Sequence, residues 1–226
     1  MKIGILQSGH LPDEFMTTLG DYDQVTARML EGRGYEFQAW RVVDNEFPSG
    51  PEDADAWMVT GSKFGAYDDC DWIAPLEELI REIRDADRPL VGICFGHQII
   101  AQALGGKVIK YPEGWAVGLQ DYTFGDDTLA LNAWHQDQVV VLPQGAEVVA
   151  SNDFCKYSAL MYGDKIFTVQ PHPEFESDAI DGLIRYRGVN IEPKELLERA
   201  TEKLNKPTAN DVLADKFAAI FAKART

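Results

Sequence analysis

Cysteine is scarce in this sequence, which contains only Cys70, Cys94 and Cys155 among its 226 residues. An odd number of cysteines, without the close spacing of metal ligands, argues against a disulfide framework. Because free thiols persist where the surroundings are reducing, we expect a cytoplasmic protein.

Long hydrophobic runs are also missing, and no stretch approaches the length that a bilayer crossing needs. The opening segment MKIGILQSGHLPDEF has a short apolar stretch and no small-residue cleavage site, which is typical of a first strand and not of a signal peptide. No linker, repeat or low-complexity run divides the chain. We therefore expect one domain over residues 1–226 and no membrane partner.

Basic residues are few relative to acidic ones, with 21 Lys and Arg against 37 Asp and Glu and a formal net charge of −16. Such a charge repels phosphate-rich partners, which argues against nucleic-acid binding. Solubility is a sufficient explanation for the acidity itself.

The first half of the chain alternates apolar runs with segments of helical periodicity. We predict strands over residues 2–7, 35–43, 53–62 and 88–94, and helices over 21–34, 72–87 and 96–106. This alternation predicts an α/β protein with an open, mostly parallel sheet and helices on both of its faces.

From about residue 107 the pattern changes to closely spaced strands separated by turn residues. We predict that these strands, from KVIKY to KIFTVQ, are antiparallel extensions of the sheet. Helices return at 176–188, 193–205 and 209–224, and their apolar stripes indicate docking on the body of the protein.

One cysteine stands at a tight turn, in the segment GICFG at residues 92–96. The pattern G-x-nucleophile-x-G is typical of a strand-to-helix elbow, whose glycines let the two arms approach closely. Cys94 would then lie at the carboxyl end of a strand, where α/β sheets bind ligands. The positive end of the following helix favours the thiolate, and its free N–H groups, including that of Phe95, can hold an oxyanion.

The elbow pattern alone leaves two interpretations of Cys94 open, because a free cysteine is commonly a small buried apolar residue. Cys70 and Cys155 have no comparable setting, and we predict that they are structural. A nucleophilic Cys94 would need a base that a third group orients.

Four histidines are available as that base. His10 lies in a polar loop after the first strand, and His135 lies between two strands. His97 follows Cys94 too closely to reach back to it and is expected to pack or to cap the helix. His172 is the favoured base.

The surroundings of His172 fix its direction. Pro171 and Pro173 interrupt strand pairing, and the residue before a proline is held extended. In an extended segment, positions i and i+2 point to the same side, so Glu174 and His172 face together. Glu174 can therefore bind one imidazole nitrogen and leave the other for Cys94.

Three segments carry a resemblance to a known family. GICFGHQIIAQALGGKV at 92–108 and QPHPE at 170–174 resemble the two signature segments of class I (triad-type) glutamine amidotransferases, and VTGSKFGAYDD at 59–69 resembles their oxyanion loop. The resemblance covers nearly the whole chain in the expected order. It implies a flavodoxin-like α/β fold, and a reaction that requires no metal and no organic cofactor.

The resemblance also implies a role for each matching residue. Cys94 is the nucleophile, His172 the base and acid, and Glu174 the orienting carboxylate. The backbone N–H groups of Phe95 and Gly61 form the oxyanion hole. The implied reaction is the cleavage of the γ-carboxamide of glutamine through a γ-glutamyl thioester, with release of ammonia and glutamate.

Substrate contacts follow from the same resemblance. Gln98 would hold the substrate. WHQDQV at 134–139 resembles a free-standing branch that includes GMP-synthase-like proteins and γ-glutamyl peptidases, which places His135, Gln136 and Asp137 near the rim of the site. A plain strand connection is the alternative for this loop. The oxyanion loop also departs from the more usual Gly-Gly-Pro type. We expect no attached acceptor-activating domain, so ammonia would pass to a separate synthase subunit or to water.

Three functions remain open at this point. The first is a glutamine amidotransferase-type hydrolase, and the second is a γ-glutamyl peptidase with the same chemistry and a larger leaving group. The third is a non-catalytic cysteine redox sensor on a similar elbow, which would not need the QPHPE segment.

Overall fold

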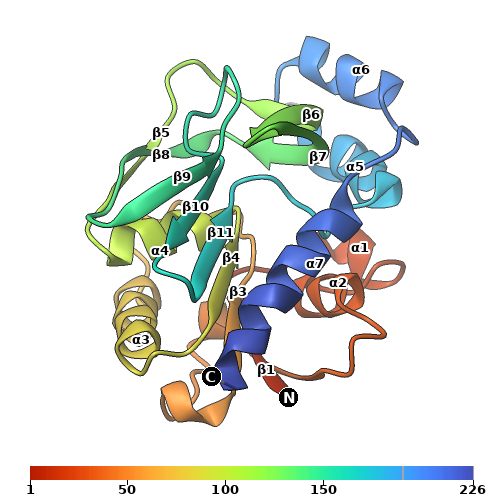
Figure 1. The fold of residues 1–226 in the computed structure, drawn as a ribbon. Coiled ribbons are helices and arrows are strands. Elements are labelled where there is room, and N and C mark those ends of the chain that lie inside the picture. Colours follow the sequence, from red (N-terminus) through yellow and green to blue (C-terminus); the bar gives the residue numbers. More distant parts are fainter. Residues whose placement is uncertain (190, 226) are drawn as a thin grey trace.

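Seven strands form one central sheet in the computed structural model, which describes residues 1–189 and 191–225. Their order is β2-β1-β3-β4-β11-β10-β9, and the first five of these run parallel to one another. With β11 counted as the fifth strand, this is the 2-1-3-4-5 order of flavodoxin-like sheets. The strands are β1 (Lys2–Leu6), β2 (Glu36–Trp40), β3 (Ala56–Val59), β4 (Leu90–Ile93), β9 (Ala146–Ala150), β10 (Ala159–Tyr162) and β11 (Ile166–Val169). The predicted α/β fold with an open, mostly parallel sheet is confirmed (Figure 1).

The second half of the chain extends this sheet only in part. β9 and β10 add antiparallel strands at one edge, but β11 lies parallel to β4. The other strands form two separate pairs, β5 (Lys107–Lys110) with β8 (Asp137–Val141) and β6 (Ala116–Phe124) with β7 (Asp127–His135). The prediction of antiparallel extensions of the sheet is confirmed for β9 and β10, but it does not hold for β6 and β7, which pair with each other along their whole length and not with the sheet.

Helices cover both faces of the sheet, as predicted. α3 and α4 lie on one face and α7 with α2 on the other, while α5 and α6 lie against the β6–β7 pair (Figure 1). The helices are α1 (Asp13–Met16), α2 (Tyr22–Met29), α3 (Ile73–Asp85), α4 (Phe95–Ala103), α5 (Ser177–Leu183), α6 (Lys194–Glu202) and α7 (Asn210–Phe221), and a π-helical segment, Ile184–Gly188, follows α5. In the described residues, none of the helices has both the length and the apolarity that crossing a membrane requires.

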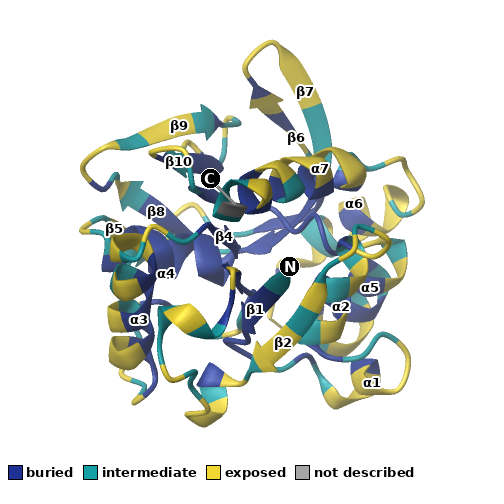
Figure 2. Cartoon of the chain, turned by 60° about the horizontal axis from the view of Figure 1, so that its bottom comes forward, coloured by how far each residue is buried: buried dark blue, intermediate teal, exposed yellow. Residues whose placement is uncertain are grey.

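Two apolar cores lie on the two faces of the sheet, and the buried residues concentrate in the central strands (Figure 2). Strand β11 contributes to both cores, because successive side chains point to opposite faces. Ile166 faces the core with α3 and α4, whereas Phe167 and Val169 face the core with α7. The fully buried polar residues Thr168 and Gln170 lie on the Ile166 side. The strand thus presents a row of polar side chains to α4.

The turn between β4 and α4 requires glycine at two positions. A Cβ on Gly92 would lie 2.6 Å from the backbone of Gly96, and a Cβ on Gly96 would lie 2.2 Å from the carbonyl oxygen of Val59. Both distances are far below van der Waals contact, and in both cases the obstacle is backbone, which cannot rotate away. The close approach of the two arms that the GICFG pattern predicts is therefore confirmed.

We expect Gly96→Ala to destabilise the protein, because its methyl group would collide with the β3 backbone. Overpacking of this kind costs about 1–3 kcal/mol, which lowers Tm by about 2–4 °C per kcal/mol in a chain of this size. Thermal unfolding of Gly96→Ala and Gly50→Ala provides the measurement, since a Cβ on Gly50 would meet no atom within 4 Å. Equal Tm values for the two variants would contradict the expectation.

Candidate active site

The carboxyl ends of three neighbouring parallel strands meet at one edge of the sheet. The loop after β3 carries Gly61, β4 runs directly into Cys94, and the chain beyond β11 reaches His172. Parallel strands end on the same side of a sheet, so residues distant in sequence come together there. A Cβ on Gly61 would lie only 3.1 Å from the His172 ring.

Cys94 occupies the elbow itself, with a φ of 52° and a ψ of −100°. A positive φ is strained for a residue with a side chain, and such strain clusters at functional sites. Cys94 is 5% exposed and directly precedes α4, so the positive end of that helix and its first N–H groups lie next to the residue. Nucleophilic cysteines commonly occupy such a position at the start of a helix.

His172 is held in one orientation by three neighbours. Its Nδ1 lies 2.7 Å from Oε1 of Glu174. Its ring stacks on that of Phe175, with centroids 4.3 Å apart and planes inclined by 4°. Its backbone N–H donates to the carbonyl oxygen of Asn132 on β7 at 2.8 Å. The structure therefore brings the buried His172 and Glu174 together and leaves Nε2 of the ring free to face another partner.

The His172 ring also interacts with Cys94, and its electrostatic surroundings favour the protonated form. Burial by itself lowers the pKa of His172, but the charges of Glu174 and Cys94 and hydrogen bonds to both raise it to about 10. The imidazolium form is thus preferred at neutral pH. A protonated histidine between a carboxylate and a sulfur is suited to an imidazolium–thiolate pair.

Two backbone donors next to this pair are unused. Phe95 is the first residue of α4, and Gly61 follows β3 beside His172. Within the described residues, neither backbone N–H donates a hydrogen bond. Free, fixed N–H groups of this kind are what an oxyanion hole requires.

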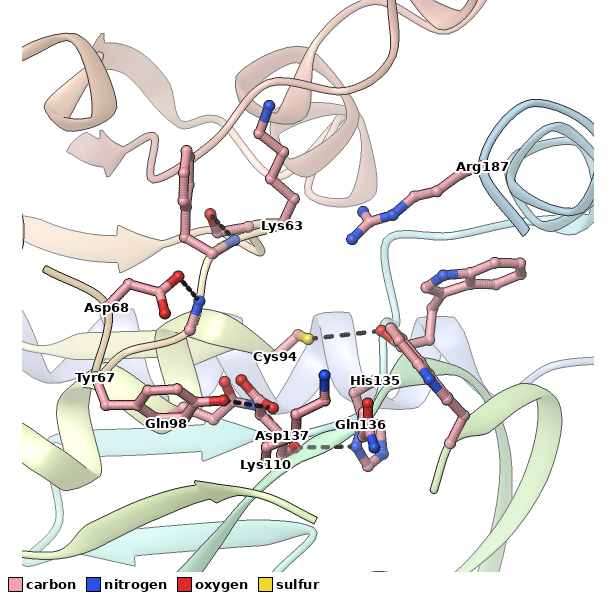
Figure 3. A pocket seen from close by; sticks show the side chains of 15 residues that line it. Lys63, Tyr67, Asp68, Cys94, Gln98, Lys110, His135, Gln136, Asp137 and Arg187 are labelled. Carbon is pink, nitrogen blue, oxygen red and sulfur yellow. Dashed lines mark hydrogen bonds between the residues drawn. The ribbon is translucent and has the colours of Figure 1, made fainter. Parts of the chain in front are cut away.

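A pocket of about 250 Å³ lies over Cys94 (Figure 3). Lys63 and Arg187 lie on one side of the sulfur in this view, and Lys110 and Asp137 on the other. Three basic side chains therefore surround the cavity of a chain whose net charge is −16. Two acidic residues, Asp68 and Asp137, line the same pocket, so its wall offers groups of both signs to a ligand.

Gln98, which was predicted to hold the substrate, lines this pocket. Its Nε2 donates to the carbonyl oxygen of Asp137 at 2.9 Å and to Oε1 of Gln170 at 3.1 Å. An amide has two N–H groups, so both donors are occupied. Only the Oε1 of Gln98 is left to accept a hydrogen bond from a ligand.

His135 and Gln136 also line the pocket. Burial, and then the neighbouring His172, lower the pKa of His135 to about 3, so its ring is neutral. Its Nδ1 lies 3.2 Å from the carbonyl oxygen of Asp137. Gln136 donates through Nε2 to the carbonyl oxygen of Tyr111 at 3.2 Å. These two residues and Asp137, which were predicted at the rim, are thus all part of the pocket wall.

The two remaining histidines have structural contacts. His97 is fully buried, with Nδ1 2.8 Å from Oγ1 of Thr168, and burial lowers its pKa to about 3. This confirms the prediction that it packs inside the protein. His10 is not simply a loop residue, because its two ring nitrogens lie 2.6 Å from Asp21 and 3.1 Å from Asp44.

The two other cysteines lack an activating environment. All three cysteines are free thiols. Burial raises the pKa of Cys155 to about 12. Burial, and then the charge of Asp68, raise the pKa of Cys70. A raised pKa disfavours the thiolate, as expected of cysteines that do no chemistry.

Three buried residues at the site were not predicted. They are Gln170, whose Nε2 lies 3.6 Å from Cys94 Sγ, Phe175, which stacks on His172, and Asn132. A signal existed for Gln170, because it lies two positions before His172 in an extended segment and so points to the same side. No local pattern marks Asn132, which reaches the site only through the fold.

Comparisons with known proteins show which family the chain belongs to. A family model described as glutamine amidotransferase class-I matches residues 20–188. Gamma-glutamyl peptidase 3 of Arabidopsis thaliana is 28% identical over 224 residues, which cover 91% of this chain and 90% of the plant protein. One subunit of the glutamine-hydrolyzing GMP synthase of Archaeoglobus fulgidus is 30% identical over 165 residues, which cover 69% of this chain and 84% of the archaeal protein.

A solved structure shows the same fold. It is that of a glutamine amidotransferase from Methylobacillus flagellatus, with a TM-score of 0.77, 21% identity and coverage of 99% of this chain and 92% of the other. The family model spans the elbow and the histidine segment alike. The chain therefore belongs to the class I glutamine amidotransferase family and is an enzyme of this amidotransferase and hydrolase class.

Proposed function

We propose that residues 1–226 form one domain that hydrolyses the γ-glutamyl carbon–nitrogen bond, with the γ-carboxamide of glutamine as the simplest substrate. The observation that carries this proposal is the buried series of contacts from Glu174 through His172 to Cys94. A nucleophile, a base and an orienting acid in one series are the parts that acyl transfer needs.

The reaction follows from the position of each group. The Cys94 thiolate attacks the γ-carbonyl carbon, and the N–H groups of Phe95 and Gly61 stabilise the oxyanion. His172 gives its proton to the departing nitrogen, which leaves a γ-glutamyl thioester on the sulfur. The neutral His172 then removes a proton from water, which attacks the thioester and releases glutamate. Glu174 keeps the ring oriented and stabilises its protonated form throughout.

The pocket wall supplies contacts for the glutamyl part of the substrate. The free Oε1 of Gln98 is suited to accept a hydrogen bond from an α-ammonium group. His135 and Gln136 bound the same cavity and would fix its position. The nearby basic side chains would bind the α-carboxylate.

A γ-glutamyl peptidase is the second candidate, and the extent of the pocket favours it. Besides Cys94, the cavity is lined by Trp115 and Trp134 and by the basic side chains of Lys63 and Arg187. An amino acid or peptide as leaving group would use this space and charge, whereas ammonia would not. Gamma-glutamyl peptidase is also the name of the plant relative.

Ammonia released from glutamine would pass to a separate synthase subunit or to water. The name of the archaeal relative, which is one subunit of a synthase, supports a partner of this kind. The cytoplasm is the proposed location, because three free thiols suit a reducing compartment.

Glutamate release from glutamine and from γ-glutamyl dipeptides, with no partner protein present, tests these proposals. We expect the wild-type enzyme to release glutamate and Cys94→Ser to give only the background rate. A kcat/KM that favours glutamine supports the first function, and one that favours the dipeptides supports the second. Wild-type enzyme that cleaves neither substrate would overturn the proposed hydrolase.

A further inference from the structure

A row of buried amide groups connects the pocket wall to the nucleophile. The carbonyl oxygen of Asp137 accepts a hydrogen bond from Nε2 of Gln98 at 2.9 Å, and the same nitrogen donates to Oε1 of Gln170 at 3.1 Å. Nε2 of Gln170 then lies 3.6 Å from Sγ of Cys94. Gln170 is 0% exposed and Gln98 is 3% exposed, and the two bonds that Gln170 makes are buried.

The direction of this row is fixed by its first member. A backbone carbonyl oxygen can only accept, so Gln98 must present its NH₂ group to Asp137. The second hydrogen of that group binds the Oε1 of Gln170. Gln170 therefore has its own NH₂ group on the side of Cys94, and its N–H donates to the sulfur.

We propose that Gln170 is a positioning residue, which fixes the direction of the Cys94 sulfur and stabilises its thiolate by donating a hydrogen bond. Gln98 acts through Gln170 by holding its amide in that orientation. The inference rests on the proposed function, in which Cys94 is the nucleophile. A donor stabilises a charged acceptor more than a neutral one, so the bond favours the thiolate over the thiol.

The other titratable groups around the sulfur do not supply the hydrogen bond that we assign to Gln170. Among the described residues, His172, Tyr22, Tyr122 and Cys155 interact electrostatically with Cys94. Burial raises the pKa of both tyrosines and of Cys155, so these three are uncharged at neutral pH. His172 supplies the charge that interacts with the sulfur, with Glu174 behind it, and Gln170 adds a neutral donor from a different side chain. The other charged groups lie on the wall of the pocket over Cys94 and are Lys63, Asp68, Lys110, Asp137 and Arg187.

The variant Gln170→Met keeps the length of the side chain and removes its N–H donor. The test is the rate at which iodoacetamide alkylates Cys94 as a function of pH, together with kcat and KM for a γ-glutamyl substrate. We expect the midpoint of the rate–pH curve to move up by about one pH unit and kcat to fall about tenfold. KM should change by less than about twofold, because the lost interaction concerns the sulfur and not the bound substrate.

Gln138→Met is the matched control. Gln138 is 3% exposed and donates to the carbonyl oxygen of Phe154, so its replacement removes a buried amide contact that does not involve Cys94. The control should keep the wild-type midpoint. If the substitutions had only a structural effect, Gln170→Met and Gln138→Met would both be less stable, and the midpoint of Cys94 alkylation would stay at its wild-type pH in both.

If Gln170→Met fails to fold, Gln170→Glu is the second variant that tests the hydrogen bond to Cys94. Its carboxylate can still accept from Gln98 but presents an oxygen to the sulfur, so the midpoint should move up further than in Gln170→Met. An unchanged midpoint in a folded Gln170 variant would overturn the proposal. Alkylation of Cys94 requires no substrate, so the two proposals can fail separately. If the wild-type enzyme shows no γ-glutamyl activity, the proposed function is contradicted and the role of Gln170 is not.

Discussion

Cys94→Ala is expected to lose γ-glutamyl hydrolysis by about 10⁴-fold or more, because the atom that forms the thioester is removed. The contacts of the His172 ring with Glu174 and Phe175 do not involve the sulfur. Substrate binding should therefore persist while turnover disappears. Steady-state release of glutamate, together with a binding measurement on the variant, checks both parts of this expectation.

Cys155→Ala is the control for that experiment. Cys155 is also a buried free thiol, but its raised pKa disfavours the thiolate. We expect this variant to keep wild-type kcat and to lose only some stability. Wild-type turnover in Cys94→Ala, or a comparable loss in Cys155→Ala, would show that the nucleophile is assigned to the wrong residue.

His172→Asn is expected to reduce kcat by about 10³–10⁴-fold, since it removes the group that protonates the leaving nitrogen and activates water. Asparagine keeps a polar side chain of similar size beside Phe175, so the fold should survive. The same variant should react much more slowly with alkylating reagents at neutral pH, because the thiolate loses its cationic partner.

The pH dependence of the wild-type enzyme follows from the same histidine. Its pKa is raised from 6.5 to about 10, so the proton needed for the leaving group is present below about 10 and lost above it. We expect kcat to fall on the alkaline side near that value. A folded-state pKa above the unfolded one stabilises the protein fully below pH 6.5, and this contribution is lost as the pH rises to about 10.

Variants of His172 and Glu174 separate the effect of the raised His172 pKa from other effects of pH. The stability difference between wild type and His172→Asn should shrink as the pH rises through that window. In Glu174→Gln, where the carboxylate charge is absent, the alkaline limb of kcat should move to lower pH. An alkaline limb that stays in place in Glu174→Gln would contradict the role assigned to this carboxylate.

The parallel half of the fold could be predicted because its signals are local. GICFG gives the end of one apolar strand and the start of a helix, and α4 begins at Phe95, next to the predicted start at residue 96. The antiparallel half could not be predicted in the same way. KIFTVQ has the composition of a buried strand whichever neighbour it pairs with, and only the fold decides that β11 lies parallel to β4.

The residues of the site likewise differ in whether a local sequence pattern could predict their contacts. His172 and Glu174 lie in one extended segment, so their contact follows from the spacing of two residues. The bonds from Asn132 to His172 and from Gln98 to Asp137 join different elements, and no periodicity reports them. Arg187 reaches the pocket from the π-helical segment after α5, which the helical pattern at 176–188 did not distinguish from an α-helix.

The most direct test of the triad is covalent trapping with a diazoketone analogue of glutamine, followed by peptide mapping of the three cysteines. The structure predicts an adduct on Cys94, unmodified Cys70 and Cys155, and much slower trapping in His172→Asn. An adduct on another cysteine, or a trapping rate that is indifferent to the loss of His172, would contradict it.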